Sequence, residues 1–272
     1  MPQSYGESSG HHRCYDLYLS MPLDEYRRKR DFSKTPEPAG DAKTHRVSAS
    51  TTSFFCVQKH LASHLHYDIR LEHNGVLLSW AIPKGPSLDP TDKRMAVRTE
   101  DHPLDYGKFE GVIPEGYGAG IVMLWDQGSW TPEVDDVDAA LKTGDLKFSL
   151  DGFKLKGSWV LVRTRDRAST SAKQRGRNWL LIKHRDFWSG PVDITELAPL
   201  SVKSEGDFDD ILSKEFPDVW VTGRPGSGAG GSARKLMEAT IESAAAKIVA
   251  RRDSAARKNK RRRTAKRKKP TR

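Results

Sequence analysis

Apolar and polar side chains alternate along short stretches of this chain. In the run 65–72 every second residue is polar, so a β-strand would place His66, Asp68 and Arg70 on one face. The apolar residues between them would lie on the other face and pack into a core. The pattern therefore predicts a strand with one polar face and one buried face.

Similar runs follow at regular intervals and are separated by turn residues. Asn74 and Gly75 lie between the runs 65–71 and 76–82, which is the strongest short-range signal for a β-hairpin. Further strands are expected at residues 54–58, 95–99, 121–125, 146–150, 153–155, 159–163 and 179–183. About eight to ten short strands at this spacing, with no convincing helix between them, predict an all-β sandwich or barrel.

Composition divides the chain into successive segments. Residues 1–50 are polar and rich in Ser, His, Pro and Arg, which predicts a flexible, disordered N-terminal arm. The strand pattern fills residues 51–190. A linker is expected at 191–231, because its second half is rich in Gly, Ser and Pro. An amphipathic helix at 232–252 and a disordered basic tail at 253–272 complete the predicted order.

The predicted C-terminal helix has a suitable N-cap in Ser232. Apolar side chains recur along it at helical spacing and form one stripe, which consists of Met237, Ile241, Ala244, Ala245, Ile248 and Val249. Such a stripe either docks on the folded domain or pairs with another chain. A second short helix is expected within residues 23–33, before two prolines end it.

Positive charge is concentrated at the C-terminus. Residues 251–272 contain 13 Lys and Arg residues and one acid, and because the formal net charge of the chain is +10, the remaining residues sum to −2. A block of like charge repels itself, which favours a disordered arm that binds nucleic acid. The densest cations are Arg261, Arg262, Arg263, Lys266, Arg267, Lys268 and Lys269. A solubilising extension and a nuclear-import signal remain as alternatives.

The remaining composition points to a soluble intracellular protein. Two cysteines, Cys14 and Cys56, are too few for a disulfide framework or a cysteine-ligated zinc site. No run approaches the ~18 apolar residues of a membrane span, so no membrane partner is expected. We expect a cytoplasmic, nucleoid-associated protein in a bacterium, or a nuclear one in a eukaryote. The 272 residues are sufficient for an enzyme with a buried core.

Candidate metal ligands lie close together in the sequence. His60, His66 and Asp68 form a set of two imidazoles and one carboxylate within nine positions, and His102 is a further candidate for the same shell. These donors suit Mn, Fe, Co or Zn rather than an all-oxygen Mg or Ca cage. The alternative is a polar strand face in contact with solvent.

Cationic residues near this set suggest an anionic substrate. Arg70, Lys84, Arg94 and His102 together resemble a phosphate pocket, in which guanidinium groups bind oxygens and an imidazole moves or orients a proton. For Lys84 and Arg94 ordinary surface charge is an equal alternative. The loops at 82–86 and 112–120 contain Pro and Gly, and such loops often line a groove.

Several long motifs then match a known family in the right order. They lie at residues 26–32, 58–72, 80–87, 101–106 and 109–111. Over about residues 23–188 the chain resembles the 3′-phosphoesterase domain of bacterial DNA ligase D, in its stand-alone form. The resemblance implies a small closed or partly open β-barrel of about eight strands with a groove across it.

The resemblance also implies a site and a reaction. His60, His66 and Asp68 would bind Mn²⁺, with other divalent transition metals such as Co²⁺ as alternatives. The residues that would hold and act on the phosphate are Arg70, Lys84, Arg94 and His102, with Glu100 and Tyr106 in support. The family removes a terminal ribonucleoside and then the 3′-phosphate from broken DNA, which leaves the 3′-hydroxyl that a ligase needs in non-homologous end joining.

The expected partners and the rival functions follow from the same residues. The substrate would be DNA, or RNA-containing DNA, with a recessed 3′ end, and a DNA ligase, a polymerase and end-joining factors would be partners. A non-haem iron oxygenase is an alternative, because His66 and Asp68 with a distant His102 imitate its facial triad. A non-catalytic protein that binds DNA ends through its tail is the third interpretation.

Overall fold

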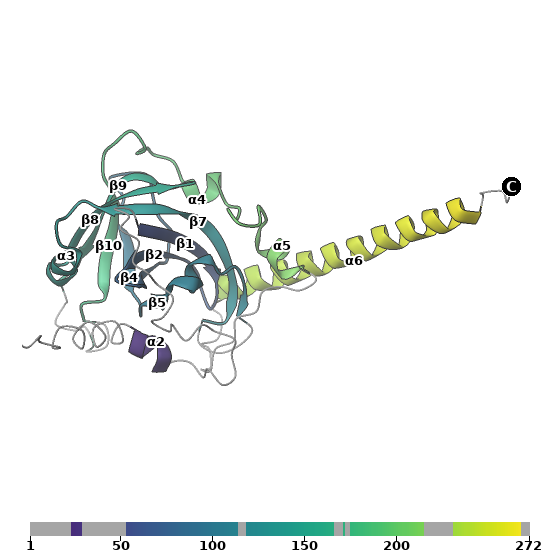
Figure 1. Cartoon of the computed structure of the whole chain (residues 1–272), viewed down its shortest axis with the longest axis horizontal. Helices are drawn as coiled ribbons and strands as arrows, with labels where there is room; N and C mark the ends of the chain where they lie inside the picture. Colours follow the sequence, from purple (N-terminus) through teal and green to yellow (C-terminus); the bar gives the residue numbers. More distant parts are fainter. Residues whose placement is uncertain are drawn as a thin grey trace, which may run out of the picture.

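The computed structural model describes residues 23–28, 53–113, 118–165, 171, 175–214 and 231–267. Its centre is an antiparallel β-barrel of eight strands, which confirms the all-β prediction (Figure 1). In spatial order the strands are β1 (Ser53–Leu61), β2 (Leu65–His73), β3 (Val76–Ile82), β4 (Arg94–Arg98), β10 (Asn178–Lys183), β9 (Lys156–Arg163), β8 (Asp145–Gly152) and β7 (Gly120–Pro132). Strand β1 also pairs with β7, and this pairing closes the barrel.

The β2–β3 hairpin forms where the sequence predicts it. Asn74 and Gly75 both have positive φ angles, 48° and 78°. A two-residue turn with both central residues in this region matches the right-handed twist of the flanking strands, and Asn-Gly adopts it readily. The hairpin fixes the register of the two strands, and His73 pairs with Val76 next to the turn.

Several short elements escaped the sequence pattern. Strands β5 (His102–Pro103) and β6 (Gly111–Ile113) flank the 3₁₀ helix η2 (Leu104–Lys108), and they are too short to show a period. The helix α3 (Val137–Thr143) contradicts the expectation that no helix interrupts the strands. Its signals are local: the Asp136 side chain accepts a hydrogen bond from Ala139 N, and Gly144 ends the helix with a φ of 86°.

Successive side chains of each strand point alternately into the barrel and out of it. Tyr67, Ile69 and Leu71 point into the main core, together with Trp80, Trp125, Trp130 and Trp159. A smaller apolar cluster of Tyr106, Phe109, Ile113 and Val122 lies outside the barrel, since Val122 pairs with His60 of β1. The polar face of β2 is thus covered by η2 and its neighbours.

Residues 191–214 differ from the predicted linker, because they form part of the folded domain. They contain α4 (Ile194–Leu197) and α5 (Phe208–Leu212), and Ile194, Phe208 and Ile211 are buried in the main core. Trp125 Nε1 donates a hydrogen bond to Ala198 O at 2.7 Å. Apolar anchors separated by turns produce no periodic pattern, so this segment had no signal in the sequence. Residues 215–230 lie outside the described part of the chain.

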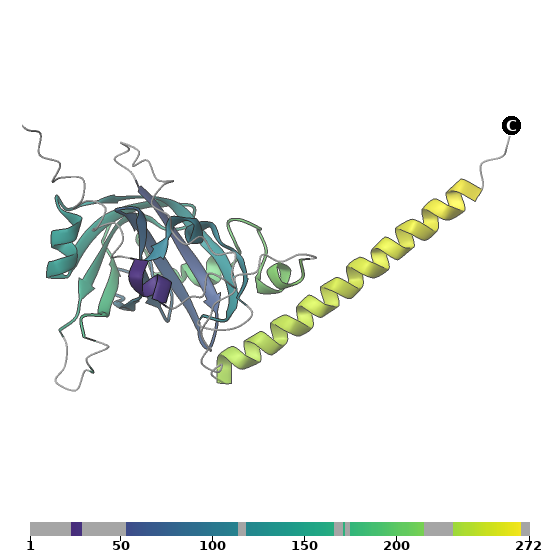
Figure 2. The ribbon, with the colours of Figure 1, turned by 60° about the horizontal axis from the view of Figure 1, so that its bottom comes forward.

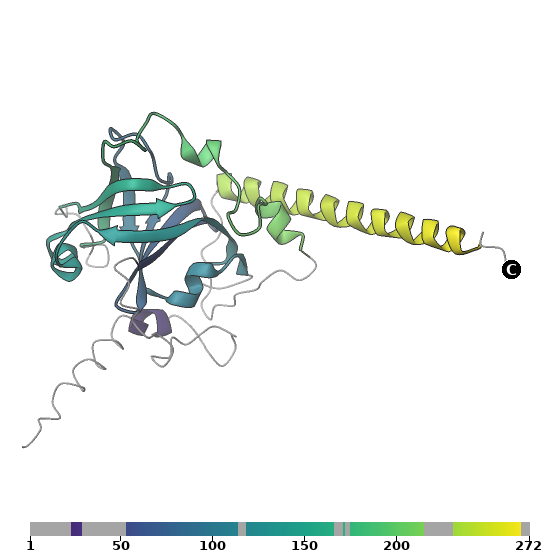
Figure 3. The same ribbon diagram turned by 45° about the horizontal axis from the view of Figure 1, so that its top comes forward.

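The C-terminal helix α6 (Gly231–Arg267) extends past the predicted end at 252 into the segment expected to be disordered. Lys, Arg and Ala are good helix formers, which accounts for the difference. Its residues 243–251 pack on α5, and the part that follows projects away from the barrel (Figures 1, 2 and 3). None of the described helices is both long and apolar enough to cross a membrane.

Only part of the predicted apolar stripe of α6 is covered. Ala244 is buried and Met237 packs against the core, whereas Ile241 and Val249 are 51% and 56% exposed. The contact with α5 is largely ionic, because Lys247 Nζ lies 3.0 Å from Asp209 and 2.6 Å from Asp210. The predicted arm at 1–50 lies outside the described residues, apart from α2 (Asp24–Arg28), which falls within the helix expected at 23–33.

The packing of residues 191–214 leads to a stability prediction. Ile211→Ala should lower the free energy of unfolding by about 2–5 kcal/mol, because it leaves a cavity in the core. Chemical denaturation measures the change. The control is Leu197→Ala, whose side chain is 71% exposed and should change stability by at most about 0.5 kcal/mol. If Ile211→Ala lowered the free energy of unfolding no more than Leu197→Ala does, this segment would be a linker as the sequence predicted.

Candidate metal centre

The polar face of β2 continues onto the neighbouring strands. In the register of β1 and β2, Gln58 pairs with Asp68 and His60 pairs with His66. Directly opposite residues of an antiparallel pair share a face, so all four side chains lie outside the barrel. Ser79 of β3 pairs with Arg70 in the same way, and it extends the polar face by one more strand.

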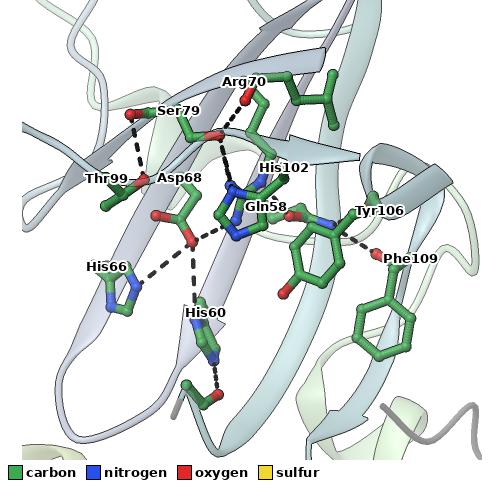
Figure 4. A network of polar contacts seen from close by, with 12 residues as sticks. Gln58, His60, His66, Asp68, Arg70, Ser79, Thr99, His102, Tyr106 and Phe109 are labelled. Atoms are coloured by element: carbon green, nitrogen blue, oxygen red, sulfur yellow. Dashed lines mark hydrogen bonds and ion pairs between the residues drawn. The ribbon is translucent and has the colours of Figure 1, made fainter. Parts of the chain in front are cut away.

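Three of these side chains converge on one point. The ligand atoms of His60, His66 and Asp68 all lie within 4.8 Å of one another (Figure 4). Asp68 Oδ2 lies 3.6 Å from His66 Nε2 and 3.9 Å from His60 Nδ1. Two ligands at ~2.1 Å from one ion are at most about 4.2 Å apart, so both separations fit a shared cation.

The second nitrogen of each imidazole is held by the backbone. His60 Nε2 donates to Gly118 O at 2.9 Å, and His66 Nδ1 donates to His64 O at 2.8 Å. With these protons in place, the lone pairs of His60 Nδ1 and His66 Nε2 both face Asp68. Metal-bound histidines are oriented in this manner, by an outer partner that fixes the tautomer. The donor set therefore suits a divalent transition metal.

Electrostatics favour the neutral state of His60 and the ionised state of Asp68, which a metal requires, whereas they favour a proton on His66, which a metal would displace. Burial and the neighbouring His66 lower the pKa of His60 to about 3. Burial also lowers the pKa of His66, but the attraction of Asp68 outweighs it and the pKa lies above its usual value. Burial raises the pKa of Asp68, and Arg70 with the two histidines overcomes this and holds it below the usual range. At neutral pH His60 is neutral and Asp68 is ionised.

Arg70 lies next to the three ligands and is fixed on several sides. Its Nε donates to Gln58 Oε1 at 2.8 Å, its Nη1 to Ser79 Oγ at 2.8 Å, and its Nη2 to Asp68 Oδ2 at 3.2 Å. Gln58 is itself anchored, because its Nε2 donates to the carbonyl oxygens of residues 106 and 109 at 3.0 Å each. The guanidinium plane therefore has one orientation.

His102 lies on the other side of this arginine. Its Nδ1 is 2.8 Å from Glu100 O and 3.0 Å from Arg70 Nη1, so Nε2 is the nitrogen that faces away from Arg70. The ring lies between two tyrosines, with centroid distances of 4.9 Å to Tyr106 and 5.6 Å to Tyr26 of α2. These contacts fix the orientation of the His102 ring relative to Arg70 and the metal ligands.

The structure brings together most of the residues that the sequence singled out. His60, His66, Asp68, Arg70, His102 and Tyr106 share one face, and Glu100 is buried beside them. Lys84 is exposed in the turn that follows β3, next to the start of β2. The predicted groove stays a prediction, because residues 114–117 of its second loop lie outside the described residues.

Arg94 differs from the expectation. Asp68 pairs with Ala81, and Ala81 pairs with Val97 of β4, so Val97 is on the face of Asp68 and Arg94 is on the opposite one. Its Nη2 donates to Asp92 Oδ2 at 2.8 Å. The sequence could not show this. Which residues of β4 share a face with Asp68 depends on the register in which distant strands pair.

Three residues of the site were not identified as functional from the sequence. Gln58 and Ser79 bind Arg70, and Tyr26 contacts His102. A signal existed for two of them: Gln58 stands two positions before His60, and Ser79 is a lone polar residue in an apolar strand. Tyr26 offered no such signal, because only the tertiary structure brings α2 to β5.

Comparison with known proteins identifies the family. The model of the DNA ligase D 3′-phosphoesterase domain matches residues 58–163, which include the three candidate ligands, Arg70 and His102. The chain belongs to the DNA ligase D 3′-phosphoesterase family. The predicted resemblance is thereby confirmed.

Relatives of the phosphoesterase domain occur in larger bacterial proteins. The chain is 52% identical over 190 residues to the multifunctional non-homologous end joining protein LigD of Pseudomonas aeruginosa, which is 68% of this chain and 22% of that protein. It is 46% identical over 150 residues to the Mycobacterium tuberculosis protein (55% and 19%). It is 38% identical over 207 residues to that of Mycolicibacterium smegmatis (74% and 25%). The chain spans only about a fifth to a quarter of these relatives.

The geometry of the phosphoesterase domain predicts stabilisation by metal. At a Mn²⁺ concentration of about 100 Kd, binding to the folded state adds ~2.7 kcal/mol, which should raise the melting temperature by roughly 5 to 10 °C. His66→Ala should lose this rise. His73→Ala is the matched control, because His73 lies at the other end of β2 and pairs with Asp138. An equal rise in His66→Ala would place the metal elsewhere. Differential scanning calorimetry measures these melting temperatures.

Proposed function

We propose that this chain is a metal-dependent phosphoesterase that processes the 3′ ends of DNA in double-strand break repair. The observation that carries the proposal is the position of Arg70, which lies 3.2 Å from the metal-ligand candidate Asp68 and 3.0 Å from His102. A cation site, a guanidinium and an imidazole in one cluster match the needs of phosphoryl transfer. The family match and the end-joining relatives support DNA as the substrate.

The reaction has two hydrolytic steps. In the first, water cleaves the bond between phosphorus and the 5′ oxygen of a terminal ribonucleoside, which leaves a 3′-phosphate. In the second, water cleaves the bond between phosphorus and the 3′ oxygen, which releases inorganic phosphate and leaves a 3′-hydroxyl. Both steps require neutralised phosphate oxygens and a proton for the leaving oxygen.

The residues divide these tasks. His60, His66 and Asp68 would hold the metal, Mn²⁺ or a similar ion such as Co²⁺, and such an ion supplies Lewis acidity to a phosphate oxygen. Arg70 binds a second oxygen and neutralises the charge that develops on it. His102, through Nε2, protonates the leaving oxygen.

Supporting residues orient this set. Glu100 holds His102 through its backbone carbonyl, and Tyr106 places its ring 4.8 Å from the Arg70 guanidinium carbon. Lys84 is exposed beyond the end of β3, where it would bind a phosphate farther along the strand. Arg94, which the resemblance assigned to the phosphate, has no role in this proposal, because its Nη2 is paired with Asp92 Oδ2.

The position of His102 argues against the oxygenase alternative. That interpretation used His102 as the distant third ligand beside His66 and Asp68. Among the described residues the ligand atoms that converge belong to His60, His66 and Asp68, and His102 is not among them. Its Nδ1 instead contacts the Arg70 guanidinium at 3.0 Å. Phosphate, which accepts from both groups, fits the arrangement better.

The basic tail is a separate part of the proposal. We expect it to bind DNA without sequence preference and to bring the domain to the broken end, in the cytoplasm of a bacterium and beside a ligase or polymerase. Of the cations named for it, Lys268 and Lys269 lie outside the described residues, and Arg261, Arg262, Arg263, Lys266 and Arg267 fall in α6.

The catalytic roles lead to an activity prediction. With a 3′-phosphate primer–template and Mn²⁺, the protein should release phosphate, and His102→Ala should lower kcat by about 10²- to 10⁴-fold. Asp68→Ala should abolish release, whereas His73→Ala should retain it. Phosphate release and gel analysis of the 3′ end measure the outcome. Unchanged turnover in Asp68→Ala, with a native melting curve, would refute the proposed function.

The tail leads to a prediction about salt. Deletion of residues 251–272 should weaken binding to duplex DNA and flatten its dependence on salt, by ~0.9 in the logarithmic slope for each lost phosphate contact. Turnover at saturating substrate should stay the same. Binding titrations at several salt concentrations measure the slope, and an identical slope would show that the tail makes no phosphate contacts.

A further inference from the structure

Two aromatic side chains stand in solvent just after β10. Phe187 is 91% exposed and Trp188 is 49% exposed, and their rings meet edge to face with centroids 5.3 Å apart. Single exposed apolar residues are ordinary on protein surfaces, but an adjacent Phe and Trp with an ordered mutual geometry are not. We call residues 186–189 the aromatic turn.

Hydrogen bonds from the buried side fix the backbone of the aromatic turn. Asp186 accepts hydrogen bonds from Ser158 N and Trp188 N, at 2.8 Å each, and from Lys183 Nζ. The side chain of Lys183 is fully buried and also donates to Ser158 O at 3.0 Å. A buried lysine paired in this way fixes the backbone that presents the two rings.

A glycine allows this close approach. A Cβ atom at Gly157, whose φ is 75°, would lie 2.2 Å from Asp186 Oδ2 and 3.0 Å from Trp188 Cδ1. Only glycine fits both this backbone conformation and this space. The first residues of β9 are therefore shaped to hold the aromatic turn in one position.

A lysine lies beside the exposed rings. Lys156 Nζ lies 5.5 Å from the centroid of the Trp188 ring, and Arg185 is exposed directly before the turn. Lys156 also pairs with Asp151 at 2.7 Å, but this carboxylate is 77% exposed, and ion pairs of this kind contribute little. The lysine is thus available to a phosphate, while Asp186 is occupied by its internal donors.

The strand pairings place the end of β10, and the aromatic turn after it, at the same end of the barrel as the start of β2, which carries His66 and Asp68. Gly190 N donates to Leu88 O at 3.0 Å, which ties it to the loop between β3 and β4. That loop begins after Ile82, the partner of Tyr67, and it carries Lys84. Lys84 is therefore an exposed cation of the loop that connects the start of β2 with the aromatic turn.

We propose that the aromatic turn stacks the unpaired bases of a DNA strand whose 3′ end, or whose partner's 3′ end, occupies the metal centre. The inference rests on the proposed function for its substrate. Exposed rings beside cations bind single strands without sequence preference, because every base has a π-face and every link has a phosphate. Two rings with Lys156 beside them fit such a strand better than an apolar protein face.

Binding of single-stranded DNA tests the proposal without turnover. The probe is a labelled oligothymidylate of about ten nucleotides, with the full chain in chelator, and fluorescence anisotropy gives Kd. The variant F187L/W188L keeps apolar area but removes both rings, and it should raise Kd about tenfold or more. A blunt duplex should bind equally to both proteins. The matched control is Phe153→Leu, because Phe153 is 72% exposed on the β8–β9 turn and should leave Kd unchanged.

The outcomes separate this proposal from the proposed function. An unchanged Kd in F187L/W188L, or no binding of the oligothymidylate by the unaltered chain, overturns the stacking surface even if phosphate release is normal. A tenfold loss supports it even if no phosphate is released. A variant F187S/W188S gives a further outcome. If it binds the strand normally but the protein sediments with a different coefficient, the stacking surface is overturned and the turn is assigned to contact with a second copy of the chain.

Discussion

The register of β1 against β2 is the constraint on which the site depends. The pairs Gln58 with Asp68 and His60 with His66 place the polar side chains on the outer face, while Ile69 and its neighbours fill the barrel. A slip of one residue would send the histidines into the core and the apolar residues to the site. Burial of the inner face therefore selects the same register that assembles the metal ligands.

That register creates a buried polar cluster which is stable only as a whole. The side chains of Asp68 and Arg70 are 9% and 4% exposed, and each finds partners within the cluster. Removal of one partner from a buried ion pair leaves a charge without compensation and costs about 3–5 kcal/mol. A cation between His60, His66 and Asp68 would take the place of the proton that Asp68 favours on His66, and it would compensate the same carboxylate.

The sequence predicted what depends on local period and turn chemistry. The alternation in 65–72 identified β2, and Asn74 with Gly75 identified its hairpin, because both signals lie within a few residues. It could not predict which face Arg94 would share, nor that residues 191–214 would pack on the barrel. Both depend on contacts between distant parts of the chain. The ligands were found because the strand placed them side by side.

The packed segment after the barrel also bears on the site. Glu110 is fully buried, and its Oε2 accepts hydrogen bonds from Leu124 N at 3.0 Å and from Ser201 Oγ. Lys203 Nζ donates to Lys108 O at 3.0 Å. These contacts tie residues 201–203 to η2 and to the stretch that carries Tyr106 and Phe109, whose carbonyl oxygens anchor Gln58 and through it Arg70. Residues far outside the ligand cluster therefore set the orientation of the guanidinium, and the folded domain has to include them for the site to keep its geometry.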